Sequence, residues 1–320
     1  MDVSLHLTIK QKIYKYVDTL FTMVEIKKII RGKKKYYYLS HSYRKGKSVK
    51  KKETYLGETL PKNMEKIKKE FMQEFYSKRF LKDIDKIKKN FNSEYKAMPK
   101  PAREKEKETF AIRFTYNTQR IEGSTLTLRE TANLIEKGIT PSKKPLSDVK
   151  EAEAHRNLFF EIFEYKKDLN FNTILLWHKK LLENTKKEIA GKIRNHGVRI
   201  SMSKFMPPLH IELDTLLHEF FKWYSNNKRK IHPVELAALV HLKFVTIHPF
   251  SDGNGRLSRL MMNFILKKHK FPMFDIPYEK RDSYYTALER SQVKKEDHIF
   301  IQWFFKRYLK EYEAYAKEKK

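Results

Sequence analysis

Two apolar segments of the chain meet at residues 248–259, which read HPFSDGNGRLSR. The segment before them, 236–247, reads LAALVHLKFVTI, and the segment that begins at Leu257 reads LSRLMMNFIL. Both have the composition of buried helices. Pro249 stops the first helix, and Gly253 and Gly255 leave the backbone free to turn. The sequence therefore predicts a tight loop between two buried helices.

The loop carries the groups of an anion site. Backbone N–H groups of a glycine-rich turn and of a helix N-terminus can converge on one point, and Arg256 and Arg259 follow one turn apart. Asp252 is suited to hold a hard cation such as Mg2+ against phosphate oxygens. His248 is suited to remove a hydroxyl proton near neutral pH. These groups predict nucleotidyl or phosphoryl transfer from a Mg2+-nucleotide to a hydroxyl.

Residues 248–259 resemble the signature of the Fic family of protein adenylylating enzymes, His-Pro-Phe-x-Asp-Gly-Asn-Gly-Arg-x-x-Arg. All nine specified positions are filled. A match of this length is far more specific than a short glycine motif. The resemblance covers roughly residues 110–310. It implies a mainly α, Fic-type helical catalytic domain with a small β-hairpin flap.

Three further segments carry the resemblance. Residues 118–123, TQRIEG, match the inhibitory motif of the family, Ser/Thr-x-x-x-Glu-Gly/Asn. Residues 191–208 resemble the flap that orients the target protein. Residues 281–288, RDSYYTAL, resemble the helix whose tyrosine lies near the adenine, here Tyr285, and Gln292 stands where relatives often carry Asn.

The resemblance also implies a role for each site residue. His248 would deprotonate a Ser, Thr or Tyr hydroxyl of a target protein or of the enzyme itself, and this hydroxyl would attack the α-phosphorus of ATP and retain AMP. Asp252 would hold Mg2+. Glu122 would compete with the γ-phosphate for Arg259. The other phosphate contacts would come from backbone and side-chain donors of Gly253, Asn254, Gly255 and Arg256.

The flap provides a prediction about target binding. Residues 197–208, GVRISMSKFMPP, alternate as a short hairpin does. An exposed strand there could bind an extended target segment through main-chain hydrogen bonds, without demanding a particular sequence. The positioning residues would be Val198, Ile200, Met202, Ser203, Lys204 and Phe205.

Two alternative functions stay open, because the signature recognises polyphosphate and not the base. Glu122 could align a water that removes AMP from a modified protein, or the group transferred could be UMP, phosphate or phosphocholine. From a different class, the protein could be a nucleic-acid-binding regulator that acts through its N-terminal region.

That region is strongly basic. The whole chain has 69 Lys and Arg against 39 Asp and Glu, a net charge of +30. Residues 24–57 read as short strands separated by turns, and residues 27–52 hold 12 Lys or Arg and no acid. With the tyrosines at 36–38, this module could bind a nucleic-acid backbone and stack its bases. Equally, the tyrosines could form the core of the module, and the charge could reflect a general bias toward lysine.

We predict three parts: a basic β-rich module at 1–60, a helical connector at 61–104, and the catalytic domain at 105–320, with its inhibitory helix at about 105–123. Without cysteine, disulfides and thiolate metal sites are excluded. No apolar run approaches the roughly 18 residues of a membrane span, and the first residues do not read as a secretory signal. We expect a cytoplasmic protein without membrane association, and oligomerisation stays open.

Overall fold

The computed structural model describes residues 24–45 and 48–317, which fall into two compact units, Met1–Tyr76 and Ser77–Lys320. Across the described residues, no helix has both the length and the apolar character needed to cross a membrane. The predicted division into three parts, with boundaries at residues 60 and 104, distinguishes the functions of the parts and not compact units, so it stays a prediction. The cytoplasmic location also stays a prediction.

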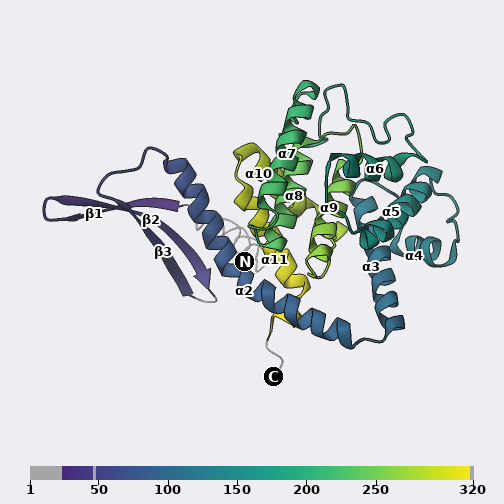
Figure 1. The fold of residues 1–320 in the computed structure, drawn as a ribbon, viewed down its shortest axis with the longest axis horizontal. Coiled ribbons are helices and arrows are strands. Elements are labelled where there is room, and N and C mark those ends of the chain that lie inside the picture. Colours follow the sequence, from purple (N-terminus) through teal and green to yellow (C-terminus); the bar gives the residue numbers. More distant parts are fainter. Residues whose placement is uncertain (1–23, 46–47, 318–320) are drawn as a thin grey trace, which may run out of the picture. The chain divides into compact units, whose positions relative to one another are not determined.

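The first unit contains a three-stranded antiparallel sheet in the order β1-β2-β3 (Figure 1). Its strands are β1 (Val24–Arg31), β2 (Lys34–Lys45) and β3 (Ser48–Gly57). Gly32, in the turn between β1 and β2, has a φ of 59°, which glycine adopts without a steric clash because it has no Cβ. The predicted β-rich module is confirmed.

The second unit is helical. Helix α2 (Met64–Ala97) begins in the first unit and continues into the second. The other helical elements are α3 (Lys100–Ile121), α4 (Leu128–Lys137), α5 (Leu146–Glu164), α6 (Phe171–Leu182), η1 (His210–Glu212), α7 (Leu213–Asn227), α8 (Pro233–Ile247), α9 (Asn254–Lys268), η2 (Tyr278–Lys280), α10 (Arg281–Lys294), α11 (Asp297–Glu311) and α12 (Glu313–Ala316). The mainly α class is confirmed.

Helices α8 and α9 lie side by side at the centre of this unit (Figure 1). Most side chains of both helices are buried, as expected for the centre of a helical domain. Helix α8 ends at Ile247 and is capped by His248, whose φ of 52° is left-handed, and α9 begins after Gly253, whose φ is 78°. Only five residues therefore separate the end of one helix from the cap of the next, and the predicted tight loop is present.

The hairpin expected at 197–208 differs in the structure. All twelve residues are described, and none lies in a strand. A turn is closed by a bond from the Ser203 N–H to the Ile200 carbonyl at 3.2 Å. The double proline at the end of the segment has no N–H to donate to a ladder, and the side chain of Arg194 binds carbonyls at both ends. The flap is thus a loop, and the prediction of paired strands is wrong.

Candidate active site

His248 follows directly on the last residue of α8. Its N–H donates to the Phe244 carbonyl at 3.0 Å, and its ring Nδ1 lies 3.3 Å from the Val245 carbonyl. This contact favours a proton on Nδ1, which leaves the lone pair on Nε2. Burial lowers the pKa of His248, so the ring is neutral at pH 7. The imidazole is in the form that can accept a proton.

The loop after His248 is held by its own side chains. Asn254 Oδ1 accepts the Phe250 N–H at 3.0 Å, and Asn254 Nδ2 donates to the Phe250 carbonyl at 2.8 Å. The Phe250 ring stacks on His178 with 3.6 Å between centroids. His178 Nδ1 accepts the Gly191 N–H at 2.9 Å, so its Nε2 is the donor to the Asp252 carbonyl, also at 2.9 Å. The loop is therefore fixed by bonds within the chain.

The N-terminus of α9 provides two of the predicted backbone donors. Asn254 and Gly255 open the helix, and the first N–H groups of a helix have no acceptor within it. The N–H of Gly253, in contrast, donates to Asp252 Oδ1 at 2.5 Å. Gly255 has a further use that the sequence did not suggest, because a Cβ there would collide with the Glu122 carboxylate. Glycine at this position allows that carboxylate to approach the helix.

Asp252 belongs to a closed ring of four alternating charges. Its Oδ2 lies 2.5 Å from Lys186 Nζ, and its Oδ1 lies 3.1 Å from Arg256 Nη2. Glu151 of α5 completes the ring by pairing with Arg256 and, at 3.2 Å, with Lys186. Burial opposes the charge of Asp252, but Arg256 and Lys186 outweigh it and lower its pKa to about 2. Arg256, expected to contact phosphate, is buried between the carboxylates of Glu151 and Asp252.

Arg259 is buried as well and is bound by the predicted inhibitory motif. Its Nη2 lies 2.5 Å from Glu122 Oε1, and its Nε donates to Thr118 Oγ1 at 2.6 Å. Its Nη1 lies 3.4 Å from the hydroxyl of Tyr284. Burial disfavours the charge of Arg259, but Glu122 outweighs this effect and raises its pKa. The guanidinium is thus fully engaged by residues of α3, its C-cap and α10.

The two residues expected near the adenine lie seven positions apart on α10 and therefore share one face. The Tyr285 hydroxyl donates to the Ile121 carbonyl at 3.0 Å, and Gln292 Nε2 donates to Thr246 Oγ1 at 3.1 Å. Gln292 also lines a pocket of about 380 Å³, together with side chains of α7 and α8 that include Trp223. Their contact with a base stays a prediction.

Arg194 connects the flap to the loop of the signature. Its side chain is 4% exposed, and it donates to three backbone carbonyls. The acceptors are His248 at 2.8 Å from Nε, and His196 and Pro208, each at 2.7 Å from an Nη. The backbone at His248 and both ends of the flap are therefore held by one guanidinium.

The tip of the flap contacts α10. The Lys204 N–H donates to Glu289 Oε2 at 2.9 Å, so this main-chain donor is already in use. Met202 is fully exposed, with a left-handed φ of 60°. The remaining residues expected to position the target lie in the same loop: Val198, Ile200, Ser203 and Phe205.

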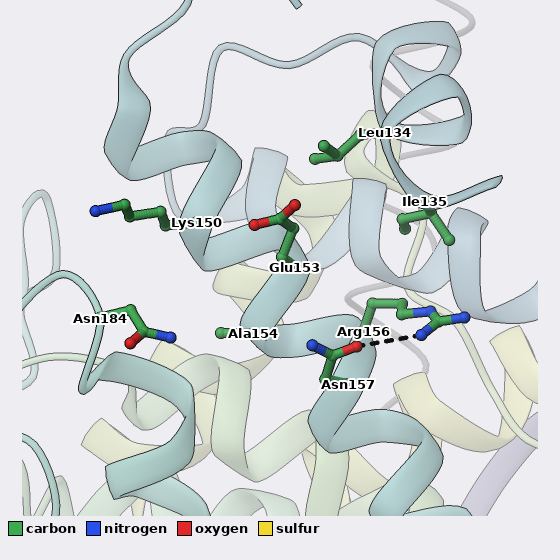
Figure 2. A pocket seen from close by; sticks show the side chains of 8 residues that line it. All are labelled: Leu134, Ile135, Lys150, Glu153, Ala154, Arg156, Asn157 and Asn184. Carbon is green, nitrogen blue, oxygen red and sulfur yellow. Dashed lines mark hydrogen bonds between the residues drawn. The ribbon is translucent and has the colours of Figure 1, made fainter. Parts of the chain in front are cut away.

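A separate pocket of about 480 Å³ lies among α4, α5 and the turn after α6 (Figure 2). Figure 2 shows the bond from Arg156 to Asn157 Oδ1, 3.2 Å long, on its wall. The lining residues are Leu134, Ile135, Lys150, Glu153, Ala154, Arg156, Asn157 and Asn184. None is a residue predicted from the sequence, and none is a histidine. This pocket does not contain the candidate chemistry.

The sequence did not reveal Lys186, Glu151 or Tyr284 as parts of the site. Lys186 is one lysine among many in a lysine-rich chain, and Glu151 is one of several acids along α5. Tyr284 precedes the tyrosine that was expected to matter, and the period of α10 could have indicated that its side chain turns inward. For the two charged residues we find no signal in the sequence.

Comparison with known families classifies the part of the chain that contains this site. Residues 168–266 match the model described as the Fic/DOC family. The chain therefore carries a Fic/DOC-family domain, and the resemblance seen in the signature is confirmed.

The proteins similar to the chain include curated adenylyltransferases and solved structures. Protein adenylyltransferase Fic of Nematostella vectensis is 32% identical over 181 residues, which cover 55% of this chain and 42% of that protein. Protein adenylyltransferase fic-1 of Caenorhabditis elegans is 32% identical over 188 residues, covering 57% and 36%. The chain thus spans about two fifths of the length of these relatives. A structure of C. elegans Fic-1 is 25% identical, covers 80% of this chain and 77% of that one, and gives a TM-score of 0.65.

Proposed function

We propose that the protein transfers AMP from ATP to a hydroxyl group of Ser, Thr or Tyr in a target protein, itself included. The observation that carries the proposal is His248, neutral and next to the N-terminus of α9. Nε2 takes the hydroxyl proton as the oxygen forms its bond to the α-phosphorus. The bond from that phosphorus to the bridging oxygen breaks, and pyrophosphate leaves. The curated relatives, named protein adenylyltransferases, support this reaction.

The phosphates of ATP would bind at the start of α9. Partial positive charge at a helix N-terminus and N–H groups without intrahelical acceptors stabilise anions, and Asn254 and Gly255 offer both. These donors also stabilise charge that develops on the α-phosphate in the transition state. Arg259 would hold the γ-phosphate once Glu122 has left it. Arg256, held by two carboxylates, would orient Asp252 rather than touch the nucleotide.

Asp252 fits the role of a Mg2+ ligand. Its carboxylate is ionised and only partly buried, and it already attracts a cation, the ammonium of Lys186. The described residues contain no group of three or more His, Asp or Glu that could hold a metal. One carboxylate completed by substrate phosphates is a common way of binding Mg2+. Bound Mg2+ would neutralise charge on the α- and β-phosphates.

Glu122 would keep the enzyme inactive at rest. Its carboxylate pairs with Arg259 at 2.5 Å and lies against Gly255, where the phosphates would enter. One guanidinium cannot give the same N–H groups to a carboxylate and to a γ-phosphate. ATP would therefore bind productively only after α3 or Glu122 moves.

Labelled nucleotides test the reaction. The protein, with Mg2+ and ATP labelled at either the α- or the γ-phosphate, should become labelled only from the α position. His248→Ala should abolish labelling while ATP binding persists, because the ring serves proton removal. His218→Ala is the matched control, since that side chain is 75% exposed. Label from the γ position, or near-normal turnover by His248→Ala, would contradict the proposal.

The same assay separates the alternative reactions. Labelled UTP, CTP and GTP report nucleotide preference, and release of label from an AMP-modified protein reports the removal reaction. If release is fast and attachment is absent, Glu122 aligns water and the protein removes AMP instead of adding it.

A further inference from the structure

The two faces of the β1–β3 sheet differ in what covers them. On one face, Leu39 and His41 are buried. The rings of His41 and Tyr43 each lie 4.8 Å from the ring of Phe75 in α2, within the same compact unit. Side chains alternate along a strand, so Leu39, His41 and Tyr43 form one row. This row with α2 is the hydrophobic core of the module.

The other face carries a different set of tyrosines. Tyr36 and Tyr38 alternate along β2 with the residues of the Leu39 row, so their side chains lie on the opposite face. Tyr38 pairs in register with Tyr55 of β3. The Tyr55 ring lies 6.2 Å from that of Tyr36 and 5.2 Å from that of Tyr38, and Tyr55 is 50% exposed. We call Tyr36, Tyr38 and Tyr55 the tyrosine face. These rings lie on the side of the sheet away from the Leu39 row, so that row and not the tyrosine face packs against α2.

Cations surround the tyrosine face. Lys27 and Arg31 of β1 and Lys51 of β3 belong to the same alternating rows. Glu53 lies among them and pairs with Lys27 at 3.3 Å, in an exposed contact of the kind that adds little stability. Glu25, which pairs in register with Ser40, is a second acid on this face. The basic residues Lys27, Arg31, Lys34 and Lys51 still outnumber the two acids. The face therefore combines aromatic rings with a positive potential.

We propose that the tyrosine face binds single-stranded nucleic acid. Bases would stack on Tyr36, Tyr38 and Tyr55, and the flanking Lys and Arg side chains would contact the phosphates. Single strands are favoured over duplexes because duplex bases are already stacked on one another and offer no free face. This activity is separate from AMP transfer and uses none of the residues of the signature.

Fluorescence anisotropy with the full chain tests the proposal. The probes are a labelled oligouridine RNA, an oligothymidine DNA of equal length, and a duplex DNA, at about 150 mM salt. We expect either single strand to bind more tightly than the duplex, and a difference between the two to report contact with the 2′-hydroxyl. Tyr55→Ala should weaken single-strand binding about ten- to a hundredfold, whereas Tyr55→Phe keeps the stacking ring and the affinity.

A matched pair of charge variants gives an independent answer. Lys51 lies on the tyrosine face, while Lys50, its neighbour in β3, lies on the opposite face. Lys51→Gln should lower both the affinity and its salt dependence, and Lys50→Gln should leave them nearly unchanged. If Tyr55→Ala unfolds the sheet, as thermal melting would show, this pair decides the question.

Three results would overturn the proposal. The first is no single-strand binding at about 150 mM salt, and the second is duplex binding as tight as single-strand binding. The third is an equal loss of affinity in Lys50→Gln and Lys51→Gln, which would mean that the basic module binds nucleic acid through its overall charge and not through the tyrosine face. Because the assay contains no ATP, AMP transfer can fail its own test without changing any of these outcomes.

Discussion

At the level of single residues, Lys186 bears on the proposed binding of Mg2+ by Asp252. In the ring of four charges, its ammonium occupies Asp252 Oδ2 at 2.5 Å and also contacts Glu151. A divalent cation at Asp252 would have to displace this ammonium or share the carboxylate with it. Like charges at such short distance disfavour each other. Mg2+ binding is therefore expected to include the cost of releasing Lys186.

Lys186→Met should tighten Mg2+ binding about three- to tenfold, because a partly exposed ion pair no longer competes for Asp252. Titration calorimetry with Mg2+ and a non-hydrolysable ATP analogue measures this. Lys187→Met is the control, since Lys187 is the next residue along the chain and its side chain is exposed. Unchanged affinity would mean that Lys186 does not compete, and weaker affinity would mean that it supports the phosphates.

At this scale, the sequence predicted the residues of the motifs and, through the resemblance, the pairing of Glu122 with Arg259. It did not predict the partners of Asp252 and Arg256. His248, Asp252 and Arg259 were found because a fixed spacing carried them. Lys186 lies 66 residues from Asp252, and Glu151 lies 105 from Arg256. Contacts between such distant positions depend on how the helices pack, which local patterns do not encode.

At the level of elements, several bonds attach the end of α3 to α9 and α10. Thr118 and Glu122 bind Arg259, and the carbonyl of Ile121 accepts the Tyr285 hydroxyl. The last turn of α3 and its C-cap are thus attached to α9 and α10 together. Loss of one carboxylate would free the guanidinium without dissolving the helix, since Glu122 is the C-cap and lies after Ile121, the last residue of α3.

Glu122→Gly should therefore raise attachment of labelled AMP to the enzyme itself by about ten- to a hundredfold, the equivalent of losing a charge-assisted pair of roughly 1.5–3 kcal/mol. Glu108→Gly provides the control, because it weakens the same helix at an exposed position without touching Arg259. Adding Arg259→Ala to Glu122→Gly should abolish the gain. A hyperactive double variant would show that Glu122 does not act through Arg259.

Helices and strands were predictable where apolar period and end signals agreed. Helix α4 is an example, with a Thr127–Glu130 capping box before it and Gly138 in a left-handed conformation after it. The conformation of the flap was not predictable, because the alternating pattern of residues 197–208 was the only signal and it indicated strands. There the buried guanidinium of Arg194 binds the carbonyls that strand pairing would need, and it comes from outside the alternating segment.

Across the helical unit, three buried histidines are kept neutral. Burial lowers the pKa of His155 and of His241 to about 3 and that of His178 to about 4. His155 lies 2.9 Å from Thr115 Oγ1, and His241 lies 3.0 Å from the Tyr284 hydroxyl, which in turn contacts Arg259. One acid opposes them: burial raises the pKa of Asp275 to about 7.

These shifts predict that the helical unit loses stability as the pH falls from about 6.5 toward 4. In this window the unfolded chain protonates three histidines that the folded chain keeps neutral, so protons favour unfolding. Asp275 acts in the opposite direction, because its folded form holds a proton that the unfolded carboxyl releases. For these four groups the net uptake of two protons lowers the free energy of unfolding by about 3 kcal/mol per pH unit. His248, whose pKa burial also lowers, adds to this loss.

Denaturant titrations at pH 7, 6 and 5, followed by tryptophan fluorescence, measure this slope. All three tryptophans, Trp177, Trp223 and Trp303, lie in Ser77–Lys320, so the signal reports the helical unit. Asp275→Asn removes the opposing group while an amide oxygen can still accept from Asn117, which donates to Asp275 at 2.5 Å. This variant should therefore lose stability more steeply with acid than the wild type. If the free energy of unfolding stays constant or increases as the pH is lowered from 6.5 to 5, the buried histidines gain protons without unfolding.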